Sequence, residues 1–251
     1  MKKLITFVLS TLMLVCLAGC SKQNAVLNEG KSYQITSVIK SLDIELNAAD
    51  FKIERGEEFL IESNLKFLSV SENNGVLKVV DTARGNSRYT GAKLTLYIPN
   101  DTVFENVEIS TGAAKLTAVG LSANYLQLKL GAGDVSFETL NAYSEVEIEG
   151  GAGKITVLNG ELHDFTLEMG VGELELTASI IGNSELEFGV GEANLTLIGS
   201  ESDYKVDIDK GLGSITVDGK NVTNFVGSAS GRNSLEIEGG VGAINLKFKK
   251  E

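Results

Sequence analysis

The sequence has little of what many enzymes and binding proteins depend on. Its 251 residues include two cysteines, one proline, one histidine and no tryptophan, and aromatic residues make up 6%. The single proline and the absence of a repeating Gly-X-Y pattern exclude collagen and proline-rich disorder. The low aromatic content argues against surfaces that stack bases or sugars. The lone histidine, His163, excludes any mechanism that needs two.

Positive charge is scarce as well, with 22 lysines and arginines against 34 acidic residues and a net charge of −12. This balance argues against nucleic acid as a partner, because phosphate binding needs a basic patch. Hydrophobic residues make up 43% of the chain, enough to form a core. The length allows one large domain or two small ones.

The first residues have the layout of an export signal. Met1–Lys3 is basic, and residues 4–15 form an apolar run that is too short to span a bilayer. Leu17-Ala-Gly-Cys20 then resembles the lipobox of bacterial lipoproteins. The resemblance implies cleavage of a signal peptide at residues 1–19 and a diacylglyceryl group on Cys20. The alternative is an ordinary secretory signal with an incidental cysteine.

Two acyl chains hold a protein stably on a membrane. We therefore expect an extracytoplasmic protein, lipid-anchored to the outer face of the cell membrane rather than to an outer membrane. Residues 20–32 would be the lipidated cysteine and a polar tether, and residues 33–251 one folded domain. Cys16 would leave with the signal, so the folded part would lack disulfides, thiolate metal sites and cysteine nucleophiles.

A glycine triplet, Gly-x-Gly, recurs six times, with successive first glycines 19 to 29 residues apart. Decayed copies lie at Gly112-Ala-Ala114 and Asn47-Ala-Ala49. The paired glycines are Gly131 and Gly133, Gly151 and Gly153, Gly170 and Gly172, Gly189 and Gly191, Gly211 and Gly213, and Gly240 and Gly242.

Each triplet lies between two runs that alternate apolar and polar residues, as Leu126-x-Leu128-x-Leu130 and Val135-x-Phe137 do around Gly131. Such alternation predicts strands with one buried face. The spacing across the triplet is odd, so the chain must bulge or bend there, and glycine permits this. Strands rather than helices follow each triplet, which favours a structural corner over a phosphate-binding loop.

A period near twenty with two strands per unit predicts an all-β, single-domain β-solenoid. The last strand, Ile244–Phe248, would form one end of the stack, its flanking lysines discouraging edge-to-edge aggregation. The other end would comprise strands at 41–46, 60–63, 76–80 and 94–98, with a polar loop at 84–90 and Pro99 closing a strand.

The runs Leu94-Thr-Leu-Tyr-Ile-Pro99 and Val107-Glu-Ile-Ser-Thr-Gly112, followed by serial Gly-x-Gly strands, resemble the toast-rack "putative adhesin" domains of bacterial envelope proteins. The resemblance covers residues 33–251. It implies stacked all-β coils, no established catalytic residues and no cofactor. Some relatives belong to envelope-stress systems, and no functional residue carries over.

Enzyme chemistry finds little support in the sequence. The four arginines, Arg55, Arg84, Arg88 and Arg232, do not recur with acidic pairs, as a polysaccharide-cleaving β-helix would need. His163 precedes Asp164, but adjacent strand residues face opposite ways, so a structural histidine is favoured over a base.

Carboxylates recur two residues before the first glycine of five triplets, where stacked coils would place them about 4.8 Å apart. The five are Glu149, Glu168, Glu187, Asp209 and Glu238, and the first triplet has Lys129 instead. One interpretation is a solvated face that keeps the protein soluble. Another is a strip that binds divalent cations or a cationic peptide, although no firm metal site is evident.

The sequence therefore predicts a non-catalytic, lipid-anchored interaction protein of the cell envelope, adhesin-like or accessory to an envelope-stress system. Its partners would be the membrane, through Cys20, and an unidentified envelope protein or surface. The alternative is a surface protein whose acidic column binds divalent cations or cationic peptides. A glycan-active β-helix enzyme is the third hypothesis.

Overall fold

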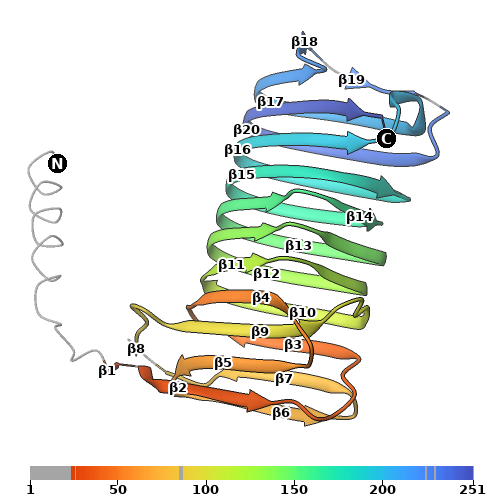
Figure 1. Ribbon diagram of the computed structural model, residues 1–251. Helices are drawn as coiled ribbons and strands as arrows, with labels where there is room; N and C mark the ends of the chain where they lie inside the picture. The colour runs from red at the N-terminus through yellow and green to blue at the C-terminus, as the bar shows by residue number, and fades with distance from the viewer. Residues whose placement is uncertain (1–23, 26, 85–86, 224, 229, 251) are drawn as a thin grey trace, which may run out of the picture.

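Strands stack along one axis into an elongated, largely parallel solenoid (Figure 1). The computed structural model describes residues 24–25, 27–84, 87–223, 225–228 and 230–250. Within that part of the chain nearly every element is a β-strand, and one short 3-10 turn, η1 (Glu201–Asp203), occurs. The expected signal peptide and Cys20 lie outside the described residues. No helix of the described part is long and apolar enough to cross a membrane.

Each coil of the central stack lies in register on the next. Strands β12 (Leu121–Phe137), β13 (Leu140–Val157), β15 (Phe165–Ile181) and β16 (Asn183–Ile198) pair in parallel, and the triplet of one coil lies on that of its neighbour. A third, short segment completes the coil: Leu121–Ala123 of β12 pairs with the start of β13, which pairs with β14 (Gly160–His163). The predicted repeat of two strands therefore lacked this third segment, but the prediction of a solenoid is confirmed.

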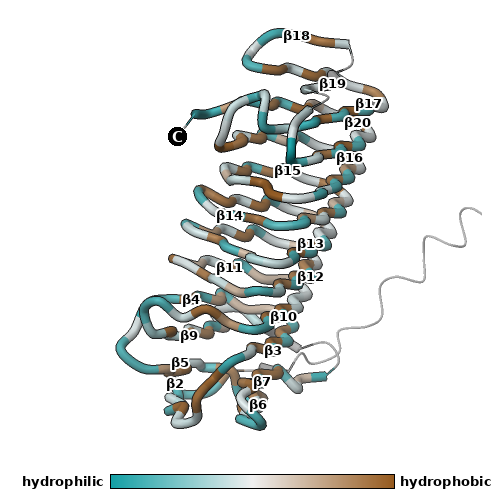
Figure 2. The backbone as a smooth tube through the Cα atoms, turned by 90° about the vertical axis from the view of Figure 1, so that its right-hand side faces the viewer, coloured by the Kyte–Doolittle hydropathy of each residue, from teal (hydrophilic) through white to brown (hydrophobic). Residues whose placement is uncertain are grey.

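The core is a continuous column of aliphatic and aromatic side chains enclosed by the coils. Leu128 and Leu130 before the first triplet are buried, and so are Val135 and Phe137 after it. Both runs thus face inward although their spacing is odd, as the break in alternation predicts. The triplets lie between them at an exposed corner, and successive corners follow one edge of the stack (Figure 2).

Glycine is needed at the corner mainly because neighbouring coils approach each other closely there. A Cβ built on Gly191 would overlap the carbonyl oxygen of Gly172 in the coil below. The φ of Gly191 is also +151°, a conformation that L side chains rarely adopt. The first glycine of a triplet, such as Gly151, has no such φ, but its Cβ would overlap Gly131. Lack of a side chain, more than positive φ, therefore selects glycine at both positions.

The decayed triplets occupy the positions expected from the sequence. Strand β3 (Ser41–Leu46) pairs with β10 (Phe104–Ala113), and β4 (Asp50–Gly56) pairs with β11 (Lys115–Ala118). Asn47-Ala-Ala49 thus lies beside Gly112-Ala-Ala114, where the amide of Ala113 donates to the carbonyl oxygen of Asn47 at 2.8 Å. In these two coils the strand is interrupted at the corner, whereas complete Gly-x-Gly corners are crossed without a break.

The N-terminal end is closed by antiparallel strands that extend both sheets of the coil. In one sheet β7 (Val76–Asp81) lies between β3 and β6 (Leu68–Asn73). In the other, β9 (Lys93–Pro99) lies between β4 and β5 (Leu60–Leu65). The four strands expected here, and Pro99 at the end of one, are confirmed. The loop expected at 84–90 contains β8 (Ser87–Arg88), which pairs with β1 (Asn24–Ala25).

The expected tether needs correction. Strand β2 (Leu27–Gln34) forms an antiparallel edge on β5, so residues 27–32 belong to the folded body. Leu27 packs against the hydrophobic core. The residues between Leu27 and Tyr33 lack the alternation of apolar and polar residues that predicts a strand, and most of the side chains of β2 are exposed.

At the C-terminal end the stacking order differs from the chain order. Strand β20 (Asn233–Lys249) pairs with β16 on one side and with β17 (Tyr204–Val217) on the other. The expectation that the last strand forms the end is therefore wrong: Lys247 and Lys249 lie on an interior strand, and β17 is outermost. Strands β18 (Lys220–Val222) and β19 (Phe225–Val226) pair antiparallel with β17. The end of the stack is thus formed by β17, whose edge is covered by β18 and β19, the segment that follows it in the chain.

Candidate interaction surface

The carboxylates predicted to form a column do lie in register. Glu149 pairs with Glu168, Glu168 with Glu187, and Glu187 with Glu238. Asp209 completes the column beyond Glu238 because β20 lies inside β17. All five side chains are exposed. Lys129 of β12 adjoins Glu149 and ends the uninterrupted acidic run.

Mutual repulsion is evident at the centre of this acidic column. The pKa of Glu187 is raised above 4.5, first because desolvation disfavours its charged form and then because Glu238, Glu168 and Glu185 surround it with negative charge. Folding raises the pKa of this carboxyl group, so the folded state holds its proton more tightly than the unfolded state does. The free energy of unfolding therefore falls as pH rises from about 4.5 through the folded-state pKa. At neutral pH the folded protein carries this penalty in full.

We therefore expect Glu187→Gln to raise the melting temperature at pH 7, because glutamine occupies the same space without the charge. The gain should shrink as pH falls from the raised pKa of Glu187 toward 4.5 and should be nearly absent below 4.5, where the native carboxyl group is itself protonated. Thermal unfolding of both proteins between pH 3.5 and 8 measures the difference. A loss of stability at pH 7, or a gain that does not change with pH, contradicts this account.

An open groove of about 1020 Å³ runs along the corner, from β3 to β20. Its lining includes the first-glycine positions, such as Gly170 and Gly189, and the side chains of Met169 and Phe188. Its charged residues are seven carboxylates and one lysine: Glu45, Asp81, Glu108, Glu149, Glu168, Glu187, Glu238 and Lys129. The acidic column therefore forms one side of an elongated groove.

The carboxylates form a row rather than a cage. Calcium takes six or more oxygen ligands around one point. No group of three or more His, Cys, Asp or Glu residues among the described ones is arranged to hold a metal ion.

A second feature of the corner was missed by the sequence reasoning. The middle residue of each complete triplet points to solvent, and from β15 to β17 that residue is large and apolar. Val171 is 53% exposed, Val190 49%, Val241 49% and Leu212 76%. They pair in the order Val171, Val190, Val241, Leu212. We call these four residues the apolar ridge. The change from alanine in the first triplets to valine and leucine in the later ones was the available signal.

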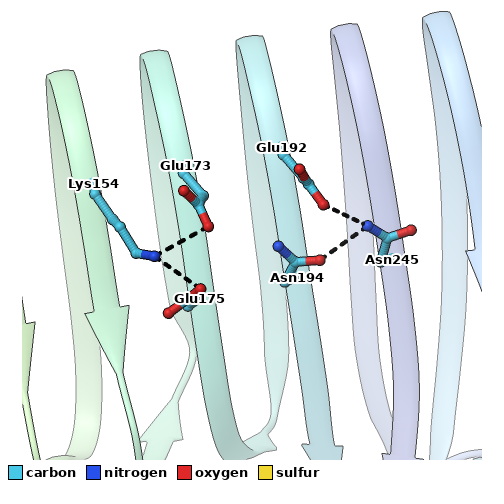
Figure 3. A network of polar contacts seen from close by, with 6 residues as sticks. All are labelled: Lys154, Glu173, Glu175, Glu192, Asn194 and Asn245. Carbon is cyan, nitrogen blue, oxygen red and sulfur yellow. Dashed lines mark hydrogen bonds and ion pairs between the residues drawn. The ribbon is translucent and has the colours of Figure 1, made fainter.

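The outer face that follows the triplets contains a group of side chains that contact one another, unlike the carboxylates of the acidic column (Figure 3). Lys154 contacts Glu173 at 3.1 Å and Glu175 at 2.8 Å, and both carboxylates raise the pKa of the lysine. Asn245 donates to Glu192 and to Asn194, each at 2.9 Å. These six residues satisfy one another's polar groups, whereas the acidic column places like charges side by side.

His163 has a local partner. Its Nε2 lies 2.8 Å from Oε1 of Glu161, two residues earlier on the same strand. The neighbouring Asp164 turns the chain with φ +42° and accepts a hydrogen bond from the amide of Asn183. The two adjacent residues thus have separate contacts.

Comparisons with known proteins agree with this architecture. A family model described as Toastrack DUF4097 matches residues 32–247. A "putative adhesin" from Bacteroides fragilis NCTC 9343 is 13% identical with a TM-score of 0.50, covering 88% of this chain and 99% of its own. A "putative cell adhesion protein" from Clostridium sporogenes ATCC 15579 is 18% identical with a TM-score of 0.39 and the same coverage. Among curated proteins no relative matches. At 13% identity the Bacteroides structure shows similarity of fold alone.

Proposed function

The chain belongs to the Toastrack DUF4097 family, and from this membership and its corner surface we propose that it is a non-catalytic interaction protein of the bacterial cell envelope. A lipid on Cys20 would hold it on the outer face of the cell membrane. It would act by contact, as an adhesin-like protein or as an accessory to an envelope-stress system. The name of the Bacteroides neighbour is consistent with this role.

The observation that carries the proposal is the contrast between the two outer faces. On one face Lys154 is paired with Glu173 and Glu175, while the corner exposes apolar side chains beside a column of like-charged carboxylates along several coils. Exposed apolar groups in a contiguous row are typical of surfaces that contact another molecule. Because the coils stack in register, the row crosses neighbouring strands, so a partner can contact several coils at once.

Anchoring is tested by replacing Cys20 with serine in the native host. We expect the native chain to sediment with membranes and to be released by detergent, and the Cys20→Ser protein to lose the lipid and leave the membrane fraction. Mass spectrometry of the N-terminal peptide reports the modification directly. An unmodified Cys20 in a secreted protein would overturn the anchor.

Contact is tested by photo-crosslinking in the same host. The photoreactive residue replaces Val190 on the apolar ridge and, as the matched control, Leu158, which is 57% exposed at the turn after β13. A discrete crosslinked product at Val190 and none at Leu158 supports the proposal. Equal products at both positions, or none at either, contradict a dedicated contact surface at the corner.

A second candidate is a surface that binds divalent cations along the acidic column. The raised pKa of Glu187 favours it, because a bound cation would relieve the repulsion from Glu168 and Glu238. It predicts that millimolar calcium raises the melting temperature and that combined Glu168→Gln and Glu187→Gln substitution removes the effect. No shift at millimolar calcium would exclude this candidate.

A further inference from the structure

The corner combines two kinds of surface that ordinarily have different partners. The groove lining contributes seven carboxylates and a single lysine. Three glycines of the lining, Gly170, Gly189 and Gly240, are each followed by a valine of the exposed apolar ridge: Val171, Val190 and Val241. A ligand lying along the corner would therefore meet negative charge on one flank and apolar side chains on the other.

Charge decides which occupants can use both flanks. A second copy docked ridge to ridge would bring two acidic columns together, and like charges suppress such pairing. An anionic membrane surface would be repelled for the same reason. A small cation would neutralise the column but leave the ridge exposed. The complementary partner is a polypeptide segment that carries basic and apolar side chains on neighbouring faces.

The repeat distance selects the conformation of that segment. Neighbouring coils are about 4.8 Å apart, and one turn of an α-helix rises about 5.4 Å. Side chains on one face of an extended strand recur only every 6.6 Å or so. Flexible lysine or arginine side chains on successive helical turns can thus follow successive carboxylates, such as Glu168 and Glu187. The groove crosses seven strands from β3 to β20, about 29 Å, which corresponds to about 19 helical residues.

We propose that the corner is a docking site for a basic amphipathic helix of another polypeptide, lying along the stack axis. Its lysines or arginines contact the acidic column, and its apolar stripe packs on Val171, Val190 and Val241. This proposal rests on the proposed function as a contact protein and adds the chemistry and geometry of the partner.

The test uses the folded chain and a synthetic 19-residue peptide of leucine and lysine, arranged as an amphipathic helix. Isothermal titration calorimetry measures binding, and circular dichroism reports whether the bound peptide is helical. A peptide of identical composition in scrambled order controls for charge alone. We expect the amphipathic peptide to bind at least about tenfold more tightly than the scrambled one and to become helical on binding.

Three sets of variants locate the site. Val171→Ser, Val190→Ser and Val241→Ser together remove the ridge, and Glu149→Gln, Glu168→Gln and Glu187→Gln neutralise the column. Each set should weaken binding by about tenfold or more. The matched control neutralises three exposed carboxylates away from the corner, by Glu57→Gln, Glu138→Gln and Glu201→Gln. It should change binding by less than about twofold. All replaced side chains are exposed, and thermal unfolding verifies that each variant folds.

Equal binding of the two peptides, unchanged affinity in the ridge variant, or an equal loss in the control variant each overturns the inference. If the protein crosslinked at Val190 has no basic helix, the inference is also overturned, but the proposed contact function still holds. Absence of any crosslinked partner, with tight and site-specific peptide binding, would instead separate the docking site from the proposed envelope role.

Discussion

Replacing Gly191 by alanine is expected to lower the free energy of unfolding by about 2–6 kcal/mol. Two costs combine at this position: a φ of +151°, at which an L residue is strained, and overlap of the new Cβ with the carbonyl oxygen of Gly172. Each is worth about 1–3 kcal/mol in proteins. Neither coil can move away alone, because each is in register with a further neighbour. Urea denaturation followed by circular dichroism measures the change.

Two other glycines separate the causes. Gly219 has φ +76° with no atom within 4 Å of a built Cβ, so Gly219→Ala tests conformational strain alone, worth about 1–2 kcal/mol. Gly151 has no strained φ, but its Cβ would overlap Gly131, so Gly151→Ala tests close approach alone. If Gly191→Ala cost no more than Gly219→Ala, contact between coils would not be what selects glycine at the corner.

The corners and core could be predicted from the sequence because both depend on local pattern. The odd spacing between Leu130 and Val135 shows that the chain must bend, whatever its neighbours are. The nearly equal steps of 19 or 20 residues between the first four triplets then indicate which residues share a column, and the register of Glu149, Glu168 and Glu187 follows from them. In a repeat, contacts between residues far apart in the chain recur at a fixed sequence spacing. This part of the fold could therefore be predicted from the sequence.

The stacking order at the C-terminal end was not accessible in the same way. Pairing β17 or β20 with β16 satisfies the same alternation and the same triplet, so the local pattern does not choose between them. The irregular steps of 22 and 29 residues around Gly211 were the only signal that the period fails there. What distinguishes the strands is the segment after β17, which folds back on it as β18 and β19.

Of the candidate surface, the acidic column could be predicted from the sequence, but the exposure of the apolar ridge could not. The acidic column depends on alternation within a strand, which gives the outward direction of Glu168 directly. The exposure of Val171 and Val190 depends on how the corner turns, and alternation is broken at that point. The change of the middle residue from alanine to valine was therefore the available signal, and alternation did not show that these valines are exposed.

Removing residues 233–251 is expected to unfold β17 as well, although β17 precedes the deleted segment in the chain. Of the described strands, β17 pairs with β20, β18 and β19. The last two are short strands from its own following segment, and such two-stranded units are marginal in water. Hydrogen exchange should show amides 204–217 approaching unfolded rates, while those of β13 and β15 remain protected.

Sequential stacking would give the opposite outcome, because β17 would keep its place on β16 when the last strand is removed. Tyr204 argues against a simple shift of β17 onto β16. Its ring lies 6.0 Å from that of Phe248, which the truncation removes, and its hydroxyl group donates to the carbonyl oxygen of Ile198 at 2.6 Å. A shortened chain lacking only residues 250–251 retains β20 and serves as the control. Protected amides at 204–217 in the longer truncation would show that one Gly-x-Gly coil can replace another on β16, so that the covering segment, rather than side-chain fit between coils, determines the order of the stack.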